Sequence, residues 1–132
     1  DRTDEAVTRM REASGLFVRV HGEYHHDSGN SFANLAGLLD ASGRGDEAEK
    51  LWRKALAVHE YTLGPAHPHT ALTRFNFGKH VFDRGSVDEA RDLWLQCRSD
   101  WADAHGPDYA LVQSLDAILP NLGPPAAGSD VP

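Results

Sequence analysis

Histidines are the residues of this sequence best suited to chemistry, because an imidazole can ligate a metal or carry a proton near neutral pH. The 132-residue chain holds eight, with His21, His25 and His26 in one group and His67 and His69 in another. A zinc site needs three or four converging ligands, and neither group has the spacing of a zinc fingerprint or a His-Glu-x-x-His motif. A glycine is expected to end a helix between the first two histidines. We therefore expect no metal site; pH sensitivity of these turns is the nearer alternative.

Other catalytic groups are poorly represented. The single cysteine, Cys97, falls among small residues and is expected to be a buried, unreactive thiol. The segment Gly43-Arg44-Gly45 lacks the Lys-Ser or Lys-Thr of a phosphate-binding loop. Acidic pairs at 46–47 and 88–89 open predicted helices, where negative charge favours the helix dipole. The sequence therefore predicts no catalytic residue and no cofactor, and a metal- or substrate-binding enzyme is only a third hypothesis.

Composition and charge argue against some classes of binding partner. Charged residues make up 25% and hydrophobic residues 40%, which is typical of a folded domain. Twenty Asp and Glu against 13 Lys and Arg give a net charge of −7, which nucleic acid or an anionic membrane would repel. No apolar run approaches the roughly 20 residues that span a bilayer, and the first residues do not resemble a signal peptide. One cysteine suits a reducing compartment. We expect a cytoplasmic chain with no nucleic-acid or membrane partner.

An internal repeat of 42 residues runs through the chain. The tripeptide Asp-Glu-Ala occurs at 4–6, 46–48 and 88–90. Further columns keep the same spacing, namely Gly22, Gly64 and Gly106; Gly43 and Gly85; Asn34 and Asn76; Trp52 and Trp94; and Ala13, Ala55 and Cys97. Such repetition is the sequence signature of stacked structural units.

Each unit is predicted to hold two helices. Ala48, Leu51, Trp52 and Ala55 fall at i, i+3, i+4 and i+7, which is one face of a helix. Glycines then interrupt the pattern where a helix end needs a positive φ, and the spacing of a serine and a glutamate at 86 and 89 predicts a capping box. The predicted helices cover residues 3–20, 28–42, 46–63, 68–84, 88–105 and 108–119.

The domain boundaries follow from the repeat. Residues 1–122 are expected to form the array, with a half repeat at 1–22, full repeats at about 23–64 and 65–106 and a terminal helix at 107–122. Residues 123–132 are rich in Pro and Gly and are expected to form a flexible tail. The first helix has the pattern of a second-half helix without its partner, which suggests a piece of a longer array; the alternative is a degenerate N-terminal cap.

Three stretches carry a family resemblance: Asn34-Leu35-Ala36, the segment around Asp46-Glu47-Ala48, and Leu63-Gly64-Pro65-Ala66-His67-Pro68. They resemble the 42-residue tetratricopeptide repeat of the kinesin light chain type, most strongly over 28–70 and also over 71–107. The resemblance implies an all-α, right-handed superhelical array of antiparallel helix pairs, an α-solenoid of about six helices. It also implies a scaffold whose concave groove, lined by the first helix of each pair, binds segments of other proteins.

The family register places several side chains in that groove. Asn34 and Asn76 are the sharpest candidates, because a carboxamide can donate to and accept from the backbone of an extended peptide; the alternative is that they bond within their own repeat. Phe75 is expected to be a ligand anchor or to pack against the adjacent helix. Only Lys79 adds positive charge, so a clamp for a C-terminal carboxylate is not expected. The predicted peptide-binding residues are Asn30, Asn34, Leu72, Phe75, Asn76, Lys79 and Asp83.

The three tryptophans are assigned differently. Trp52 and Trp94 stand in one repeat column and are expected to pack in the core rather than to stack on bases. Trp101 is assigned no repeat partner and is expected to be partly exposed.

The leading functional prediction is a non-catalytic module that binds a peptide or helix of a partner protein, as the sensor or docking part of a larger regulatory protein. The alternative is a structural role, in which the chain forms a homodimer or an intramolecular scaffold through the apolar flank of its unpartnered first helix.

Overall fold

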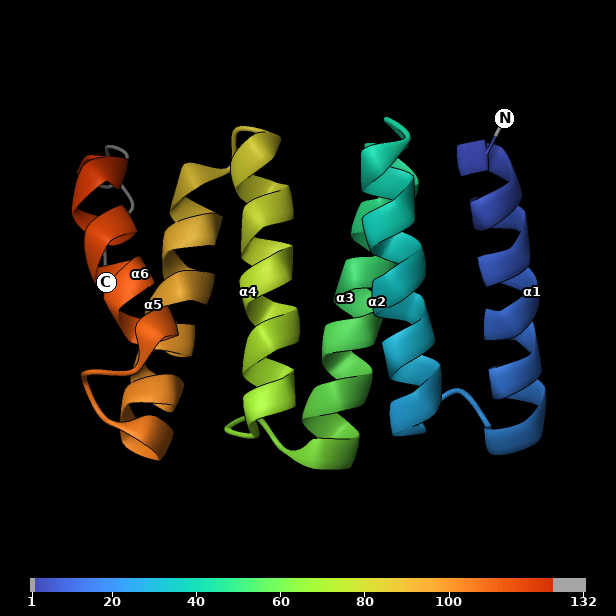
Figure 1. Ribbon diagram of the computed structural model, residues 1–132, viewed down its shortest axis with the longest axis horizontal. Coiled ribbons are helices and arrows are strands. Elements are labelled where there is room, and N and C mark those ends of the chain that lie inside the picture. The colour runs from blue at the N-terminus through green and yellow to red at the C-terminus, as the bar shows by residue number, and fades with distance from the viewer. Residues whose placement is uncertain (1, 125–132) are drawn as a thin grey trace, which may run out of the picture. The chain divides into compact units, whose positions relative to one another are not determined.

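The computed structural model describes residues 2–124 and holds, within that range, six α-helices, one short 3-10 helix and no strand (Figure 1). The helices are α1 (Arg2–His21), α2 (His26–Ala41), α3 (Gly45–Leu63), α4 (Pro68–Asp83), α5 (Val87–His105), α6 (Ala110–Ile118) and η1 (Leu119–Leu122). Each predicted helix is present, and its ends agree with the prediction to within two residues. The all-α fold class is confirmed. Most of the predicted tail, from residue 125 onward, lies outside the described residues.

The chain divides into two compact units, residues 1–73 and 74–132. The first unit holds α1, α2, α3 and the opening turns of α4. The second unit holds the remainder of α4 together with α5, α6 and η1. None of the described helices has the length and apolar character that a bilayer crossing requires.

A glycine in the left-handed region ends each of the first five helices. These glycines have φ between 78° and 96° and are Gly22, Gly43, Gly64, Gly85 and Gly106. A side chain at such a φ would be strained, so glycine is the residue that lets the chain leave the helix here. The glycines are spaced by 21 residues, half of the sequence repeat, so each half repeat consists of one helix and one turn.

The core of the first unit lies between consecutive antiparallel helices. In Figure 1, α2 lies beside both α1 and α3, and the contacts agree. Phe32 of α2 is buried against Ala55 and Val58 of α3. Trp52 is also buried, and its indole nitrogen donates a hydrogen bond to Asp40 Oδ2 at 2.8 Å. The prediction that Trp52 packs in the core is confirmed.

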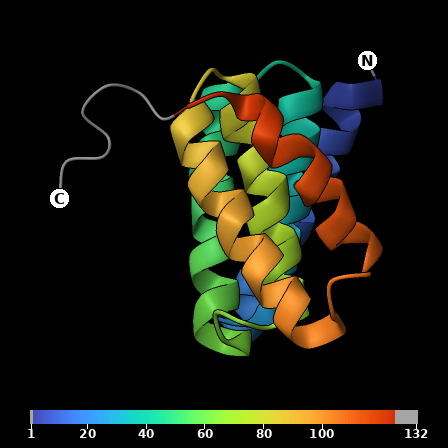
Figure 2. The same ribbon diagram turned by 90° about the vertical axis from the view of Figure 1, so that its left-hand side faces the viewer.

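The core of the second unit is built around two indoles on α5, which lies beside α6 (Figure 2). Trp94 is buried as predicted, and its Nε1 donates to the backbone carbonyl of Phe75 at 3.1 Å. The expectation for Trp101 is wrong, because this side chain is only 2% exposed and its ring contacts those of Phe75 and Tyr109. Trp101 does have repeat partners 42 and 84 residues earlier, and the nearer of them, His59, is also buried.

The predicted capping box at the start of α5 does not form. Ser86 occupies the N-cap position, but its side chain makes no cap hydrogen bond. Its backbone, with φ −86° and ψ 69°, lies outside the extended conformation that usually directs a serine hydroxyl onto the first turn of a helix. The helix therefore begins without the predicted side-chain cap.

Candidate functional site

Six of the seven predicted binding residues, all except Phe75, fall along one stripe on each first helix. The α2 stripe consists of Asn30, Asn34, Gly37 and Ala41, and the α4 stripe consists of Leu72, Asn76, Lys79 and Asp83. Within each stripe the spacing is i, i+4, i+7 and i+11, which keeps the four residues on one helix face. Each α4 member lies 42 residues after its α2 counterpart. None of the eight is buried, whereas the residues between them include the core positions of both helices.

The asparagines of the α2 stripe differ in their surroundings. Asn30 Oδ1 lies 2.8 Å from His59 Nε2, so this carboxamide bonds within its own repeat, which is the alternative considered for the groove asparagines. The side chain of Asn34 is exposed and makes no hydrogen bond within the described part of the chain. Its donors and acceptor therefore face solvent.

The α4 stripe offers apolar, amide and charged groups side by side. Leu72 is 43% exposed, and Lys79 and Asp83 are exposed as well. Asn76 is half-buried, and its side chain has no hydrogen-bond partner among residues 2–124. Phe75 instead packs within its unit, with its ring centroid 5.6 Å from that of Trp101, so in this structure it follows the packing alternative.

His59 of α3 is hydrogen-bonded to Asn30, the first residue of the α2 stripe, a role that the sequence analysis missed. The side chain is buried, with Nδ1 2.9 Å from Thr73 Oγ1 and Nε2 near Asn30. Because Asn30 Oδ1 can only accept, Nε2 carries the proton, and in the neutral ring Nδ1 is an acceptor for the Thr73 hydroxyl. The same hydroxyl oxygen lies 3.2 Å from the backbone carbonyl of His69, which competes for its proton. Burial, together with the nearby His69, lowers the pKa of His59 to about 4, so the ring is neutral at pH 7. Its repeat column, which includes Trp101, was the available signal that this histidine belongs to the core.

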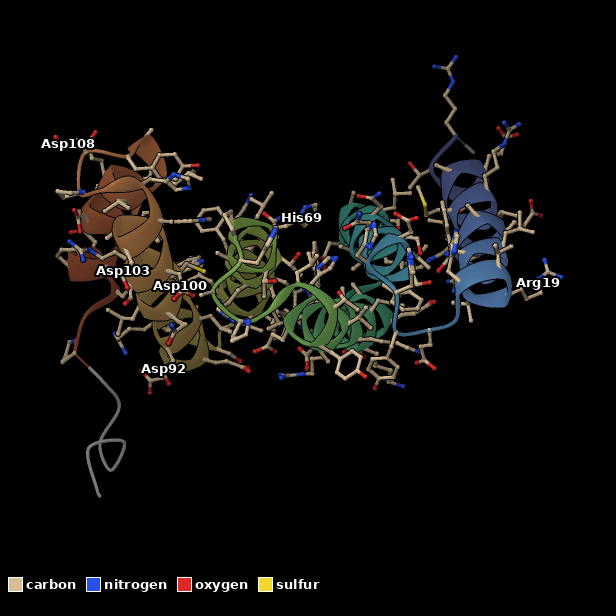
Figure 3. All side chains as sticks on the ribbon, turned by 90° about the horizontal axis from the view of Figure 1, so that it is seen from below. Arg19, His69, Asp92, Asp100, Asp103 and Asp108 are labelled. Atoms are coloured by element: carbon tan, nitrogen blue, oxygen red, sulfur yellow. The ribbon has the colours of Figure 1, made fainter. Side chains whose placement is uncertain are left out.

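The second unit contains a buried ion pair between Arg74 of α4 and Asp100 of α5. Asp100 is labelled in Figure 3. Arg74 Nη1 donates to Asp100 Oδ2 at 3.1 Å, and the two side chains are 6% and 10% exposed. Cys97 is buried nearby on α5, as predicted, and burial raises the pKa of its thiol to about 12. A thiol with this pKa is almost wholly protonated at pH 7 and a poor nucleophile.

The turn between α1 and α2 gathers histidines that the sequence analysis did not expect to converge. Gly22 ends α1 as predicted, but the following turn places the imidazole of His21 4.4 Å from that of His25, centroid to centroid. His26 also stacks with His25, again with 4.4 Å between ring centroids. The carboxylate of Asp27 lies within 3.8 Å of all three rings.

Comparison with known proteins identifies the repeats. The sequence model of the tetratricopeptide repeat family matches residues 29–69. A relative from Arabidopsis thaliana, protein KINESIN LIGHT CHAIN-RELATED 3, is 34% identical over 87 residues, which are 66% of this chain. A crystal structure of a Podosopora anserina kinesin light chain with nearly identical TPR-like repeats has a TM-score of 0.82 over 91% of this chain and 57% of that one, at 21% identity. The chain therefore carries tetratricopeptide repeats.

Two further matches cover most of the chain. The crystal structure of BtubC (BKLC) from P. vanneervenii has a TM-score of 0.83 at 19% identity and covers 92% of this chain and 48% of its own. A clustered mitochondria protein homolog from Debaryomyces hansenii is 26% identical over 117 residues, or 89% of this chain. The chain spans only 13% of the length of the Arabidopsis relative and 9% of the yeast one. The matches to kinesin light chain-related proteins show that the tetratricopeptide repeats here are of the kinesin light chain-like type.

Tetratricopeptide arrays of this type are generally protein–protein interaction modules and are typically non-catalytic. Their helix pairs leave one face of each first helix open, because each pair buries its other faces against its neighbours. The two stripes described above are the open faces of the first helices in this chain.

Proposed function

We propose that this chain is a non-catalytic module that binds a peptide or helix of a partner protein along the α2 and α4 stripes. It would serve as the sensor or docking part of a larger regulatory protein in the cytoplasm. The observation that carries the proposal is that the same four register positions stay open on both first helices. The neighbouring positions on the same helices, such as Leu35 and Phe77, are buried.

The chemistry of the stripes favours recognition of a peptide backbone and small apolar side chains. Asn34 and Asn76 present carboxamides that can donate to and accept from an extended strand, whatever its sequence. Leu72 adds an apolar contact, and Gly37 and Ala41 leave room for a ligand side chain. Lys79 and Asp83 carry opposite charges, so a strongly charged peptide gains little net attraction. Because a free peptide must be ordered on binding, we expect micromolar affinity for a short segment.

Site-specific photocrosslinking tests the proposal. Peptides selected for binding to the whole chain are mixed with variants that carry a photoreactive amino acid at position 34 or 76. Matched controls carry it at Arg53 or Gln96, which are exposed on the second helices α3 and α5. Crosslinks at the stripe positions with little reaction at the controls support the proposal. Equal crosslinking at all four positions, or reaction at the controls alone, contradicts it.

A self-assembling role is the second candidate, and the outer face of α1 favours it. Leu16 is 54% exposed and Val20 71%, and together with Ala13, Phe17 and His21 they line a shallow apolar hollow of about 380 Å³. The repeat counterparts of Ala13 and Phe17, at positions 55 and 59, are fully buried. In this chain the face therefore lacks the cover that its counterparts have.

Sedimentation equilibrium from 1 to 200 micromolar separates the two candidates. A homodimer through α1 predicts a mass that doubles with concentration and returns to that of the monomer in Val20→Lys. A constant monomer mass removes the self-assembly alternative and leaves the binding proposal unaffected.

A further inference from the structure

We propose that the α1–α2 turn forms a site for one zinc-class divalent cation, held by His25, His26 and Asp27 with His21 as the fourth donor. The donor atoms of His25, His26 and Asp27 lie within 4.8 Å of one another. His21 approaches them from the end of α1, with Nε2 3.8 Å from Asp27 Oδ2. We call these four residues the turn cluster.

The spacing of the turn cluster is close to that of a tetrahedral ion. Zinc binds imidazole nitrogen and carboxylate oxygen at about 2.0–2.2 Å, so neighbouring ligand atoms in a tetrahedron are about 3.3 Å apart. His26 Nε2 lies 3.3 Å from Asp27 Oδ1, and His25 Nδ1 lies 3.8 Å from Asp27 Oδ2. The rings of His21 and His26 are stacked with that of His25, so the imidazoles must rotate to direct their lone pairs at one ion. Three imidazoles and one carboxylate suit zinc and its neighbours in the transition series, and suit magnesium or calcium poorly.

Contacts around the turn fix its backbone without using the donors of His21 or His26. Ser28 Oγ donates to the carbonyl of Gly22 at 2.7 Å, which ties the start of α2 to the end of α1. Glu23 forms an ion pair with Lys54, and Tyr24 packs edge-on against Tyr61 with 5.4 Å between ring centroids. The donors are 33–51% exposed, so an ion from solution can reach them.

His25 has a second role that limits the affinity. Its Nδ1 accepts the backbone N–H of Asp27 at 3.1 Å and so caps α2. An ion that takes the Nδ1 lone pair must displace this hydrogen bond. His67, 42 residues later, makes the same cap with the N–H of His69 at 3.0 Å, so the cap recurs in the next repeat, where the described residues form no metal cluster around it. The corresponding residue of the third repeat, Tyr109, makes no such cap.

The repeat supplies an internal comparison for the other donors. The position of His21 is held by Leu63 in the next repeat and by His105 in the one after. The position of His26 is held by Pro68 and then by Ala110, neither of which has a side-chain donor. The turn cluster is therefore additional to what the repeat needs to fold, and within the described chain it is the one group found that could hold a metal ion.

The test uses the whole chain, purified without a histidine tag and dialysed against a chelator. Zinc is titrated by calorimetry and by competition with a chromophoric chelator, with magnesium as the negative control. We expect one zinc per chain with a dissociation constant of about 1–10 micromolar. Zinc at 100 micromolar should also raise the melting temperature, since an ion that binds only the folded state stabilises it. His26→Asn should weaken binding about tenfold or more and remove most of the thermal shift.

The matched control is His105→Gln, because this exposed histidine also ends a helix and shares the repeat position of His21. It should bind zinc like the unmodified chain. The melting temperature of each variant without zinc shows that it is folded. The proposal is overturned if no saturable binding occurs below 100 micromolar zinc, or if both variants weaken binding equally. A mass that doubles on zinc loading would place the ion between two copies and would also overturn it.

Discussion

The Nε2 atom of His59 on α3 lies 2.8 Å from Oδ1 of Asn30 on α2. A buried imidazole thus holds the first residue of an exposed stripe, with its Nε2–H donating to the carboxamide oxygen. Uptake of a second proton would occur on Nδ1, which faces the Thr73 hydroxyl, inside a buried site. Burial therefore links the folded state to the neutral form of the His59 ring.

This link predicts a pH dependence of stability. The pKa of His59 is lowered to about 4 in the folded state from 6.5 when unfolded, so on acidification the unfolded chain takes up the proton first. The stabilising contribution is complete above pH 6.5 and is lost as the pH falls from 6.5 towards 4, with a slope of up to about 1.4 kcal/mol per pH unit. Urea unfolding at pH 7.0, 5.5 and 4.5 measures it. The comparison is with His59→Gln, which cannot titrate. If the stability difference between the two proteins does not change with pH, the assignment of His59 is wrong.

Gly78 predicts a local packing limit in the second unit. A Cβ built at this position would lie 2.4 Å from Trp94 Nε1, so Gly78→Ala must displace the indole from its hydrogen bond to the chain. We expect Gly78→Ala to destabilise the protein by about 1–3 kcal/mol. Gly15→Ala is the matched control, because this helical glycine has nothing within 4 Å of the added carbon. The control should gain about 0.5–1 kcal/mol. Equal effects in thermal unfolding would show that the indole tolerates the methyl group.

The ion pair between Arg74 and Asp100 predicts a large cost on removal of one partner. Arg74→Ala leaves a carboxylate that is 10% exposed without its cation, which we expect to cost about 3–5 kcal/mol. Arg53→Ala breaks an exposed pair with Glu49 on α3 and should cost less than about 1 kcal/mol. Chemical denaturation of the two variants decides the point. A loss for Arg74→Ala no larger than that for Arg53→Ala would mean that Asp100 is stabilised by other groups, of which Gln96 is one.

The stripe asparagines predict a separation of binding from stability. The side chains of Asn34 and Asn76 make no hydrogen bond within the described residues. Asn34→Ala and Asn76→Ala should therefore change the melting temperature by little more than 1 °C, and the free energy of unfolding by about 0.5 kcal/mol or less. Each should weaken a stripe-binding peptide by about 1–1.5 kcal/mol, roughly tenfold, through loss of backbone hydrogen bonds. Fluorescence anisotropy with a labelled peptide measures the affinity. Asn30→Ala serves as the contrast, because it should lower stability by removing the partner of His59. Normal peptide affinity in both variants would remove the stripes as the binding surface.

The positions of the helices could be predicted from the sequence because the same periodic pattern recurs in each repeat. The glycine spacing set the turns, and the column of Trp52 and Trp94 marked a buried position that the structure confirms. Trp101 was misjudged because its column holds a histidine at position 59, and a buried polar residue hides the core character of the column. Ser86 was misjudged because the spacing of a capping box does not fix the backbone conformation of its first residue.

The candidate site was harder to predict than the fold. The stripe residues are not buried, but whether one of their side chains is already hydrogen-bonded or packed depends on contacts from other helices. Asn30 is held by a residue 29 positions away, and Phe75 packs on Trp101, 26 positions away. The turn cluster arises because a short turn folds one helix end against the next helix start, which sequence spacing alone does not reveal.

The 21-residue spacing of the turn glycines has a consequence for how such a chain can change length. Unequal crossing-over between two copies of a 42-residue coding unit yields in-phase products, in which every helix keeps its length and every turn its glycine. An insertion or deletion of one residue within a helix would instead rotate the following positions by about 100° around the axis. Duplication is therefore a route by which a chain like this one can grow while its buried columns stay aligned.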